Sequence, residues 1–183
     1  KTLISDPGYF MFGNHRFRDD KEGGHGAVDM YKSIVESCDT YYYTLARDMG
    51  VDLMHDQMKP LGFGQITGID ILGESRGVLP STEWKRNTYK KPEQQRWYSG
   101  ETISLGIGQG YNNFTMLQIA HAMGTVANNG LKMKPHLVRE VVDVETKICF
   151  MKNTISPVTM YLVFGRSSEW KTTEISKVPA ILV

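Results

Sequence analysis

The sequence lacks any apolar run of about 18 residues, the length that a membrane-spanning helix needs. It also lacks a strong charge of either sign, because 21 Lys and Arg face 20 Asp and Glu. This balance gives no reason to expect nucleic acid as a partner. The start, KTLISDPG, shows no signal-peptide pattern. The two cysteines, Cys38 and Cys149, are too few for a disulfide framework, although a single bridge or metal ligation stays open.

The sequence does contain a helical apolar stripe, in VDMYKSIVESCDTYYYTLARDM, that polar residues interrupt. Apolar residues recur there at every third or fourth position, which is the spacing of one helix face. Ser37 and Asp39 lie on this segment, and both residue types are preferred helix caps and poor choices inside a helix. The pattern predicts two helices, at about 28–36 and 40–49, joined by a tight junction at Ser37-Cys38-Asp39.

The remaining segments differ in composition. Residues 1–27 contain the turn signals DPG, GN and GGHG, which predict a loop-rich segment. We expect helices around the junction over residues 28–72. Residues 73–100 are poor in aliphatic side chains and predict a long surface loop. Residues 101–147 combine a glycine-rich loop with a helix at about 115–128.

A basic and aromatic stretch, TEWKRNTYKKP, lies inside the predicted surface loop. Such a mixture is found in nucleic-acid-binding patches, but it is also found in solvated loops. Because the chain as a whole is not basic, we favour the solvated loop and expect no nucleic acid as a partner.

Three stretches, SCDTYYYTLARDMG, LGFGQITGIDILGESRGVLPS and TISLGIGQGYNNFTMLQIAHAMGTVANNG, together resemble the transpeptidase domain of class B penicillin-binding proteins. DPGYF, RFRDD and GGHGAVDMYKSIVES favour the elongation-specific penicillin-binding protein 2 subfamily. The resemblance covers roughly residues 5–147 and leaves 148–183 as a divergent tail. It implies a mainly α chain, the helical part of the α/β penicillin-recognising fold, with little of its central antiparallel sheet.

The family resemblance implies a serine enzyme that cross-links peptidoglycan stem peptides and is acylated by β-lactams. Its site is built from an S-x-x-K motif, an S-x-N or S-x-D motif and a K-[ST]-G motif. Ser37-Cys38-Asp39 matches the second motif. By resemblance, Ser37 relays a proton to the leaving amine, and Asp39 holds the polar network or caps the following helix. The residues alone permit another interpretation, in which Ser37 and Asp39 are only helix caps.

Two of these three motifs have no counterpart in the expected order. Residues 168–171, SEWK, match S-x-x-K only as text. We therefore interpret the chain as a D,D-transpeptidase fragment that is inactive alone. The resemblance implies a location on the periplasmic face of the inner membrane, with stem peptides, β-lactams and elongation-machinery proteins as partners. The alternative is a non-catalytic, zinc-stabilised binding module.

The resemblance also implies one structural zinc site. Some members of the penicillin-binding protein 2 subfamily hold zinc with two aspartates, a histidine and a cysteine in this order. Asp6, Asp19, His25 and Cys38 match that set, and zinc accepts carboxylate, imidazole and thiolate ligands. Asp20 is an alternative to Asp19. A small buried thiol that binds no metal is the alternative to ligation by Cys38.

Overall fold

The computed structural model describes residues 3–152 and 157–160. The chain divides into two compact units, Lys1–Gln57 with Leu79–Asn112, and Met58–Val78 with Asn113–Val183. None of the described helices combines the length and the apolar character needed to cross a bilayer. Most of the predicted divergent tail, including residues 168–171, lies outside the described residues.

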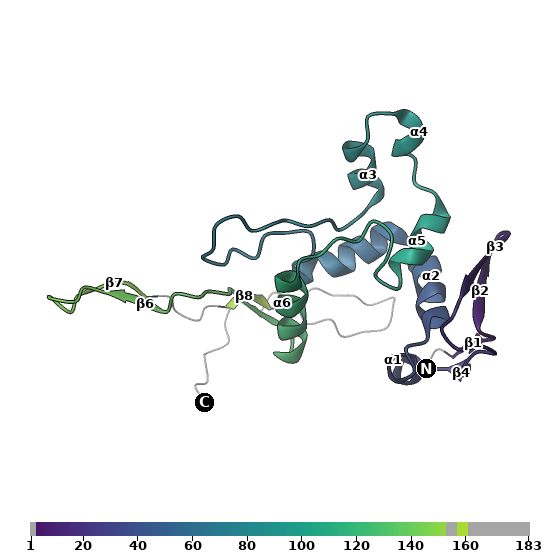
Figure 1. Ribbon diagram of the computed structural model, residues 1–183, viewed down its shortest axis with the longest axis horizontal. Helices are drawn as coiled ribbons and strands as arrows, with labels where there is room; N and C mark the ends of the chain where they lie inside the picture. The colour runs from purple at the N-terminus through teal and green to yellow at the C-terminus, as the bar shows by residue number, and fades with distance from the viewer. Residues whose placement is uncertain (1–2, 153–156, 161–183) are drawn as a thin grey trace. The chain divides into compact units, whose positions relative to one another are not determined.

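The first unit begins with two antiparallel pairs of short strands (Figure 1). One pair is β1 (Ile4–Asp6) with β4 (Gly26–Val28), and the other is β2 (Tyr9–Phe12) with β3 (His15–Arg18). A two-residue turn at Gly13-Asn14 joins β2 to β3, and the φ of 56° at Gly13 favours glycine there. The prediction of a loop-rich segment over residues 1–27 was therefore wrong. The strands have only three or four residues, too few to show an alternating pattern.

Two helices follow, α1 (Met30–Val35) and α2 (Asp39–Met58). They confirm the predicted pair of helices and the junction between them. Gly50 interrupts α2 with φ 73° and ψ 162°, so the first half of α2 ends where the sequence predicted a helix stop. The short 3-10 helix η1 (Lys59–Leu61) comes next.

Three more helices belong to the first unit: α3 (Thr82–Thr88), α4 (Pro92–Gln95) and α5 (Ser99–Leu105). Much of the predicted surface loop at 73–100 is therefore helical, and that prediction was wrong there. Helices this short show no apolar stripe in the sequence, but the residues at their N-termini are typical of helix starts. The Ser81 side chain accepts a hydrogen bond from the Trp84 amide, and Pro92 begins α4.

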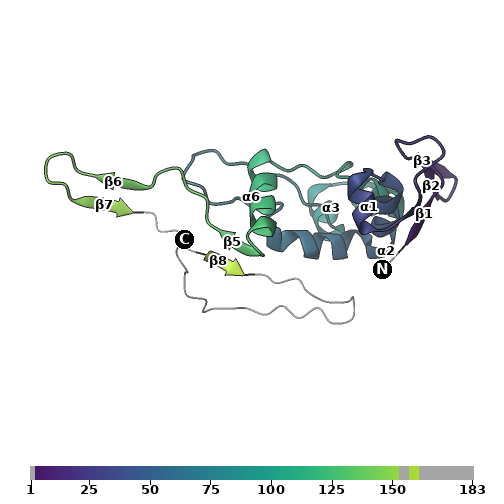
Figure 2. The ribbon, with the colours of Figure 1, turned by 90° about the horizontal axis from the view of Figure 1, so that it is seen from below.

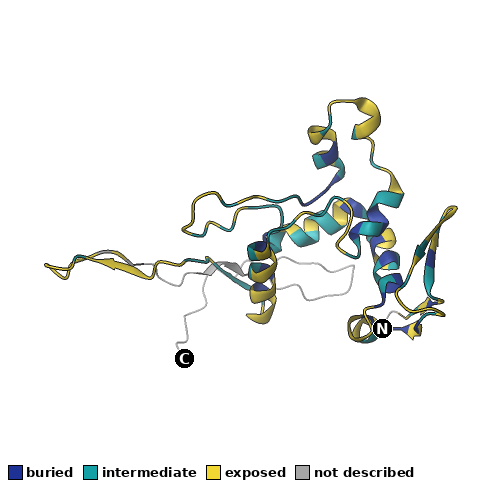
Figure 3. Cartoon of the chain, in the orientation of Figure 1, coloured by how far each residue is buried: buried dark blue, intermediate teal, exposed yellow. Residues whose placement is uncertain are grey.

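A hydrophobic core joins the first hairpin to α2 and α5. Phe10, Tyr43 and Ile103 are buried together, and Phe12 and Phe17 pack against them. The strands lie beside α2 in both views (Figures 1 and 2), and buried residues gather on α2 and α5 (Figure 3). Removing these side chains from water is the main favourable term that holds the three elements together.

An ion pair fastens α3 to α5. The Lys85 ammonium lies 2.5 and 2.6 Å from the two carboxylate oxygens of Glu101. Lys85 is only 3% exposed, although the sequence placed it in a solvated loop. Burial opposes both charges, but the pairing raises the pKa of Lys85 and lowers the pKa of Glu101. The rings of Trp97 and Tyr111 lie 5.3 and 5.2 Å from the ammonium and add cation–π attraction.

The second unit contains α6 (Met116–Ala127) and four short strands. The strands are β5 (Leu131–Met133) paired with β8 (Pro157–Met160), and β6 (Glu140–Val142) paired with β7 (Cys149–Lys152). A capping box between Thr115 and Gln118 starts α6, which confirms the helix predicted at about 115–128. The Gln118 amide also donates to the carbonyls of Gln65 and Arg76 and so holds the preceding loop against the helix.

Every sheet among the described residues has only two strands, whereas helices form most of the regular structure. The architecture therefore confirms a mainly α chain with little sheet.

We predict that Lys85→Met lowers the free energy of unfolding at pH 7 by about 3 kcal/mol, because it leaves Glu101 charged and without its partner. The charged Glu101 contributes to the free energy of unfolding at pH values above its ordinary pKa. This contribution is lost as the pH falls through the lowered pKa that Glu101 has in the folded protein. The difference between wild type and variant should therefore shrink in acid. Urea unfolding at pH 7 and pH 3.5 would check this, with the exposed Lys90→Met as control. An equal difference at both pH values would contradict the pairing.

Candidate metal centre and active-site motif

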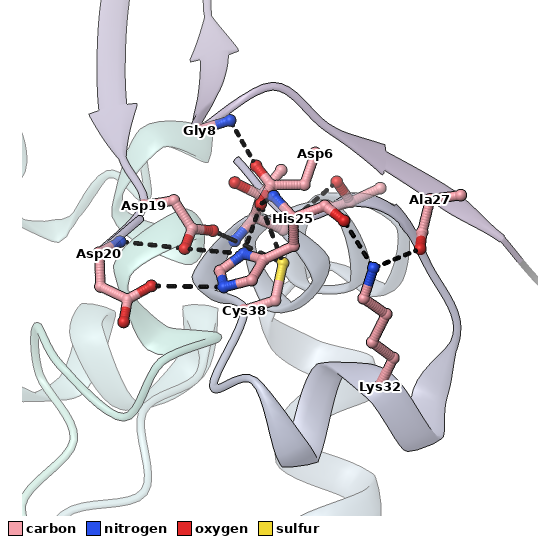
Figure 4. A network of polar contacts seen from close by, with 10 residues as sticks. Asp6, Gly8, Asp19, Asp20, His25, Ala27, Lys32 and Cys38 are labelled. Atoms are coloured by element: carbon pink, nitrogen blue, oxygen red, sulfur yellow. Dashed lines mark hydrogen bonds and ion pairs between the residues drawn. The ribbon is translucent and has the colours of Figure 1, made fainter. Parts of the chain in front are cut away.

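Four polar side chains converge where the strands of the first unit meet the helix junction (Figure 4). Asp6 ends β1, Asp19 follows β3, His25 precedes β4, and Cys38 lies between α1 and α2. One ligand atom from each residue lies within 4.8 Å of the others. The structure thus brings together all four residues that the sequence analysis named as metal ligands.

The backbone of the strands sets this convergence. The register of β1 with β4 pairs Asp6 with Gly26, which places Asp6 beside His25. Gly24 has φ 76°, and a Cβ there would lie 2.2 Å from the Asp6 carbonyl oxygen. Only glycine permits this close approach. The GGHG sequence therefore lets the histidine segment lie against the end of β1.

Asp6 is a buried carboxylate held in its charged form. Its Oδ1 accepts a hydrogen bond from the Gly8 amide at 2.7 Å, and its Oδ2 accepts from the His25 amide at 2.8 Å. Burial alone would raise the pKa of Asp6, but these amides stabilise the anion and lower the pKa to about 2. Asp6 therefore offers a charged oxygen to the cluster throughout the neutral range.

Asp19 is a ligand candidate that also caps a helix. Its Oδ2 accepts from the Thr40 amide in the first turn of α2 at 2.7 Å, and its Oδ1 accepts from the Asp20 amide at 2.9 Å. Burial is the largest influence and opposes the charge, but the hydrogen bonds to Asp19, of which the Thr40 amide gives the strongest, together outweigh it and lower the pKa of Asp19. The N-terminus of a helix favours a negative charge. No local pattern indicates this cap, because Asp19 and Thr40 lie 21 residues apart in the chain.

Cys38 is fully buried, with its sulfur 3.5 Å from Asp6 Oδ2 and 3.6 Å from Asp19 Oδ2. Burial and the two negative carboxylates raise the pKa of the Cys38 thiol to about 12. A divalent cation among these groups would reverse that effect, because it favours the thiolate. Cys38 and the exposed Cys149 are both free thiols, so the structure does not support the disulfide alternative.

The His25 ring lies between the cluster and a second carboxylate. Its Nδ1 is 2.7 Å from Asp6 Oδ2 and 3.5 Å from Asp19 Oδ1. Its Nε2 points outward, 3.8 Å from Asp20 Oδ1. The Asp19 side chain is fully buried, whereas the Asp20 side chain is 64% exposed. The geometry therefore selects Asp19 rather than Asp20 as a member of the cluster.

The donor set fits a tetrahedral zinc ion. Ligands at about 2.0–2.3 Å from zinc lie about 3.3–3.8 Å from one another in a tetrahedron. The two contacts of Cys38 and the contact of His25 with Asp19 fall in this range. The contact of His25 with Asp6 is shorter, because it is a hydrogen bond that a metal would replace. The contact with Cys38 uses Asp19 Oδ2 and the contact with His25 uses Asp19 Oδ1. The four side chains therefore lie close enough together to hold a metal ion, with one ligand atom of each within 4.8 Å of the others.

Ser37, the predicted catalytic serine, adjoins this cluster in the chain. It is exposed and has a φ of 54°, the left-handed conformation that favours glycine. The Cys38 amide donates to the Ser33 carbonyl at 3.0 Å, which is the bond of a Schellman turn with Ser37 at its left-handed position. Among the described residues the Ser37 hydroxyl has no hydrogen-bond partner. The Ser37 side chain therefore caps neither helix, whereas its backbone is part of the C-terminal cap of α1.

Asp39 is the first residue of α2, and its side chain is half-buried. It does not cap the helix either, since the Thr40 amide is bound by Asp19. Burial and the negative charges of Asp19 and Asp20 raise the pKa of Asp39.

The comparisons with known proteins identify the family of this chain. The sequence matches the family described as penicillin binding protein transpeptidase domain over residues 1–178. The chain belongs to this family. The match extends past Lys147, where the sequence analysis expected the resemblance to end.

Named relatives of this transpeptidase domain are similar over most of the chain. Peptidoglycan D,D-transpeptidase MrdA of Acinetobacter baumannii is 50% identical over 140 residues, which are 75% of this chain and 20% of that protein. Penicillin-binding protein 2 of Pseudomonas aeruginosa is 37% identical with a TM-score of 0.70, covering 84% of this chain and 34% of that chain. The complex between penicillin-binding protein 2 and MreC from Helicobacter pylori gives 31% identity and a TM-score of 0.66, covering 80% and 26%. These matches confirm the predicted resemblance to penicillin-binding protein 2. The chain spans about a fifth of the length of the curated relative from Acinetobacter baumannii.

The sequence analysis missed Lys32, a residue of α1 that holds the backbone around His25. Its ammonium donates to the carbonyl of His25 at 2.6 Å and to the carbonyl of Ala27 at 3.1 Å. Both bonds go to backbone atoms, so no pattern of side chains in the sequence indicates them.

We predict that Ser37→Gly raises the free energy of unfolding by about 0.5–1 kcal/mol, because glycine relieves the left-handed backbone. Ser37→Ala should leave it within about 0.5 kcal/mol, since it keeps the Cβ and removes a hydroxyl without partners. Urea unfolding of the three proteins checks both values. Destabilisation by Ser37→Ala would show that the hydroxyl holds the junction after all.

Proposed function

We propose that the chain is part of a peptidoglycan D,D-transpeptidase in which Ser37 and Asp39 belong to the active site. The observation that carries this proposal is the conformation of Ser37, whose exposed hydroxyl is presented on a left-handed residue beside the buried Cys38. Residues held in such strained conformations cluster at functional sites. A glycine would be the more stable choice if the hydroxyl had no role.

A hydroxyl suits a proton relay because it can donate and accept at the same time. In the proposed reaction, the Ser37 oxygen accepts a proton from the active-site base and its hydrogen passes to the leaving amine of the stem peptide. The Schellman turn fixes the serine backbone, so the hydroxyl needs little reordering before the reaction. Asp39 supports the polar network around this serine.

We further propose that Asp6, Asp19, His25 and Cys38 hold one structural zinc ion. Two observations support this proposal: one ligand atom of each residue lies within 4.8 Å of the others, and the set combines carboxylate, imidazole and thiol groups, which zinc accepts. When bound, zinc supplies a double positive charge that stabilises the thiolate and offsets the two carboxylates. Cys38 releases its proton to solvent, and the strand segments become fixed to the junction that carries Ser37.

The substrates of the whole protein are proposed from its relatives. The curated relative is named a peptidoglycan D,D-transpeptidase, and the matched family is named for penicillin binding. We therefore propose peptidoglycan stem peptides as substrates and β-lactams as acylating inhibitors. The relative from Helicobacter pylori forms a complex with MreC, which supports elongation-machinery proteins as partners. We also propose the periplasmic face of the inner membrane as its location, because peptidoglycan cross-linking is the activity proposed from the relatives.

Ser37→Ala in the full-length protein that carries this segment should slow β-lactam acylation by about 10²–10⁴-fold, because it removes a proton relay. The measurement is the acylation rate constant with a fluorescent penicillin. Ser99→Ala removes another exposed serine, on α5, and should leave the rate unchanged. Acylation of Ser37→Ala at the parental rate would exclude the relay.

Protein purified without added zinc should contain about one equivalent of zinc by elemental analysis. Cys38→Ser should reduce this content to less than a tenth and lower the melting temperature, because the thiolate is a ligand. Cys149→Ser, which changes the exposed cysteine, should alter neither value. Folded wild-type protein without zinc would refute the metal site. A zinc-loaded protein that no β-lactam acylates, even at full length, would favour the non-catalytic binding module.

A further inference from the structure

The two ring nitrogens of His25 face different partners (Figure 4). The Nδ1 atom faces the proposed ligand cluster, at 2.7 Å from Asp6 Oδ2 and 3.5 Å from Asp19 Oδ1. The Nε2 atom faces away from the cluster, toward Asp20 Oδ1 at 3.8 Å. The ring is almost completely buried, whereas the Asp20 carboxylate is exposed on the surface. At 3.8 Å the pair is an ion-pair contact and not a hydrogen bond, so a hydrogen bond requires the exposed Asp20 side chain to come closer to the ring.

We infer that Asp20 is a positioning residue for the metal centre, whose carboxylate accepts the Nε2 hydrogen of His25 when Nδ1 binds the metal. The inference rests on the zinc site proposed above and concerns a residue outside the four ligands. Histidines that bind metals usually donate their second ring hydrogen to a carboxylate, a carbonyl or water.

The position of the ring hydrogen explains why the second partner matters. A carboxylate only accepts hydrogen bonds, so the short contact with Asp6 requires a hydrogen on Nδ1 of His25. A metal can bind Nδ1 only when this nitrogen has no hydrogen. The neutral ring then carries its hydrogen on Nε2, the nitrogen that faces Asp20. Asp20 therefore favours the form of His25 that binds metal.

The backbone of the same segment is already fixed. Lys32 donates to the carbonyls of His25 and Ala27, on the two sides of Gly26. The Asp20 amide donates to Asp19 Oδ1 at 2.9 Å, which holds Asp20 next to a ligand. Because hydrogen bonds hold both backbone segments, the His25 ring can still differ in its orientation and in which nitrogen carries the hydrogen. We infer that Asp20 determines these two properties.

A simpler account is that Asp20 attracts the cation only through its charge. Glu22 offers a matched control, because it is another exposed carboxylate on the same loop and it has no contact with the ring among the described residues. If charge alone mattered, Glu22→Gln and Asp20→Ala would weaken metal binding to similar, small extents.

The test measures the zinc dissociation constant of the 183-residue chain by competition with a chelator of known affinity. Asp20→Ala should weaken zinc binding about 10–100-fold, the usual effect of losing an outer-shell partner. Glu22→Gln should change the dissociation constant by less than about twofold. Asp20→Glu should restore most of the affinity, because a longer carboxylate still reaches Nε2.

The cobalt-loaded proteins provide a second readout. Asp20→Ala should keep the thiolate-to-cobalt absorption and the intense visible bands of four-coordinate cobalt, because no ligand is lost. Weakened visible bands would instead make Asp20 a ligand and overturn the inference. Equal effects of Asp20→Ala and Glu22→Gln would overturn it while leaving the zinc site intact. If wild-type protein binds no zinc, both the zinc site and this inference fail.

Discussion

The packing of two carboxylates, a thiol and an imidazole in one buried place is the constraint on which the first unit depends. Burying like charges together is costly unless a cation or hydrogen bonds offset them. Backbone amides from three segments, at Gly8, His25 and Thr40, supply part of that compensation. Each of these amides belongs to an element that must be correctly placed, so the charge cluster and the local fold require one another.

This arrangement links the candidate metal centre to the candidate catalytic residue through the backbone. Asp19 holds the first turn of α2, and Cys38 lies between that turn and Ser37. The Schellman bond from Cys38 to Ser33 then defines the conformation of the serine. If the cluster became disordered, the backbone of Ser37 would lose its conformation too, because Ser37 is the direct neighbour of Cys38 in the chain. The metal is thus proposed to support catalysis through geometry, with no direct part in the chemistry.

Local patterns predicted the helices better than the strands. Ser37 and Asp39 interrupt an apolar stripe, and this was enough to locate the junction, while the glycine-rich loop before the helical run at about 115–128 indicated where α6 lies. The strands at the start of the chain are too short to show a pattern, and the burial of Lys85 depends on Glu101, a partner distant in sequence. The set of four candidate ligands followed from the family resemblance rather than from the residues alone. Only the three-dimensional structure distinguished Asp19 from Asp20. The two are adjacent residues of the same type, and what separates them is that the Asp19 side chain is buried whereas the Asp20 side chain is exposed.

The division of the chain into two units has a consequence for folding during synthesis. The chain passes between the units three times, after residues 57, 78 and 112, so neither unit is one continuous segment. All four cluster residues precede α2, whereas Ile103, which completes the core beside Phe10 and Tyr43, is translated much later. Domains generally fold as the chain emerges from its N-terminal end. Within this chain, the cluster residues are therefore all translated before the core of the first unit is complete, and the cluster can hold the first strands while the ribosome is still making α5.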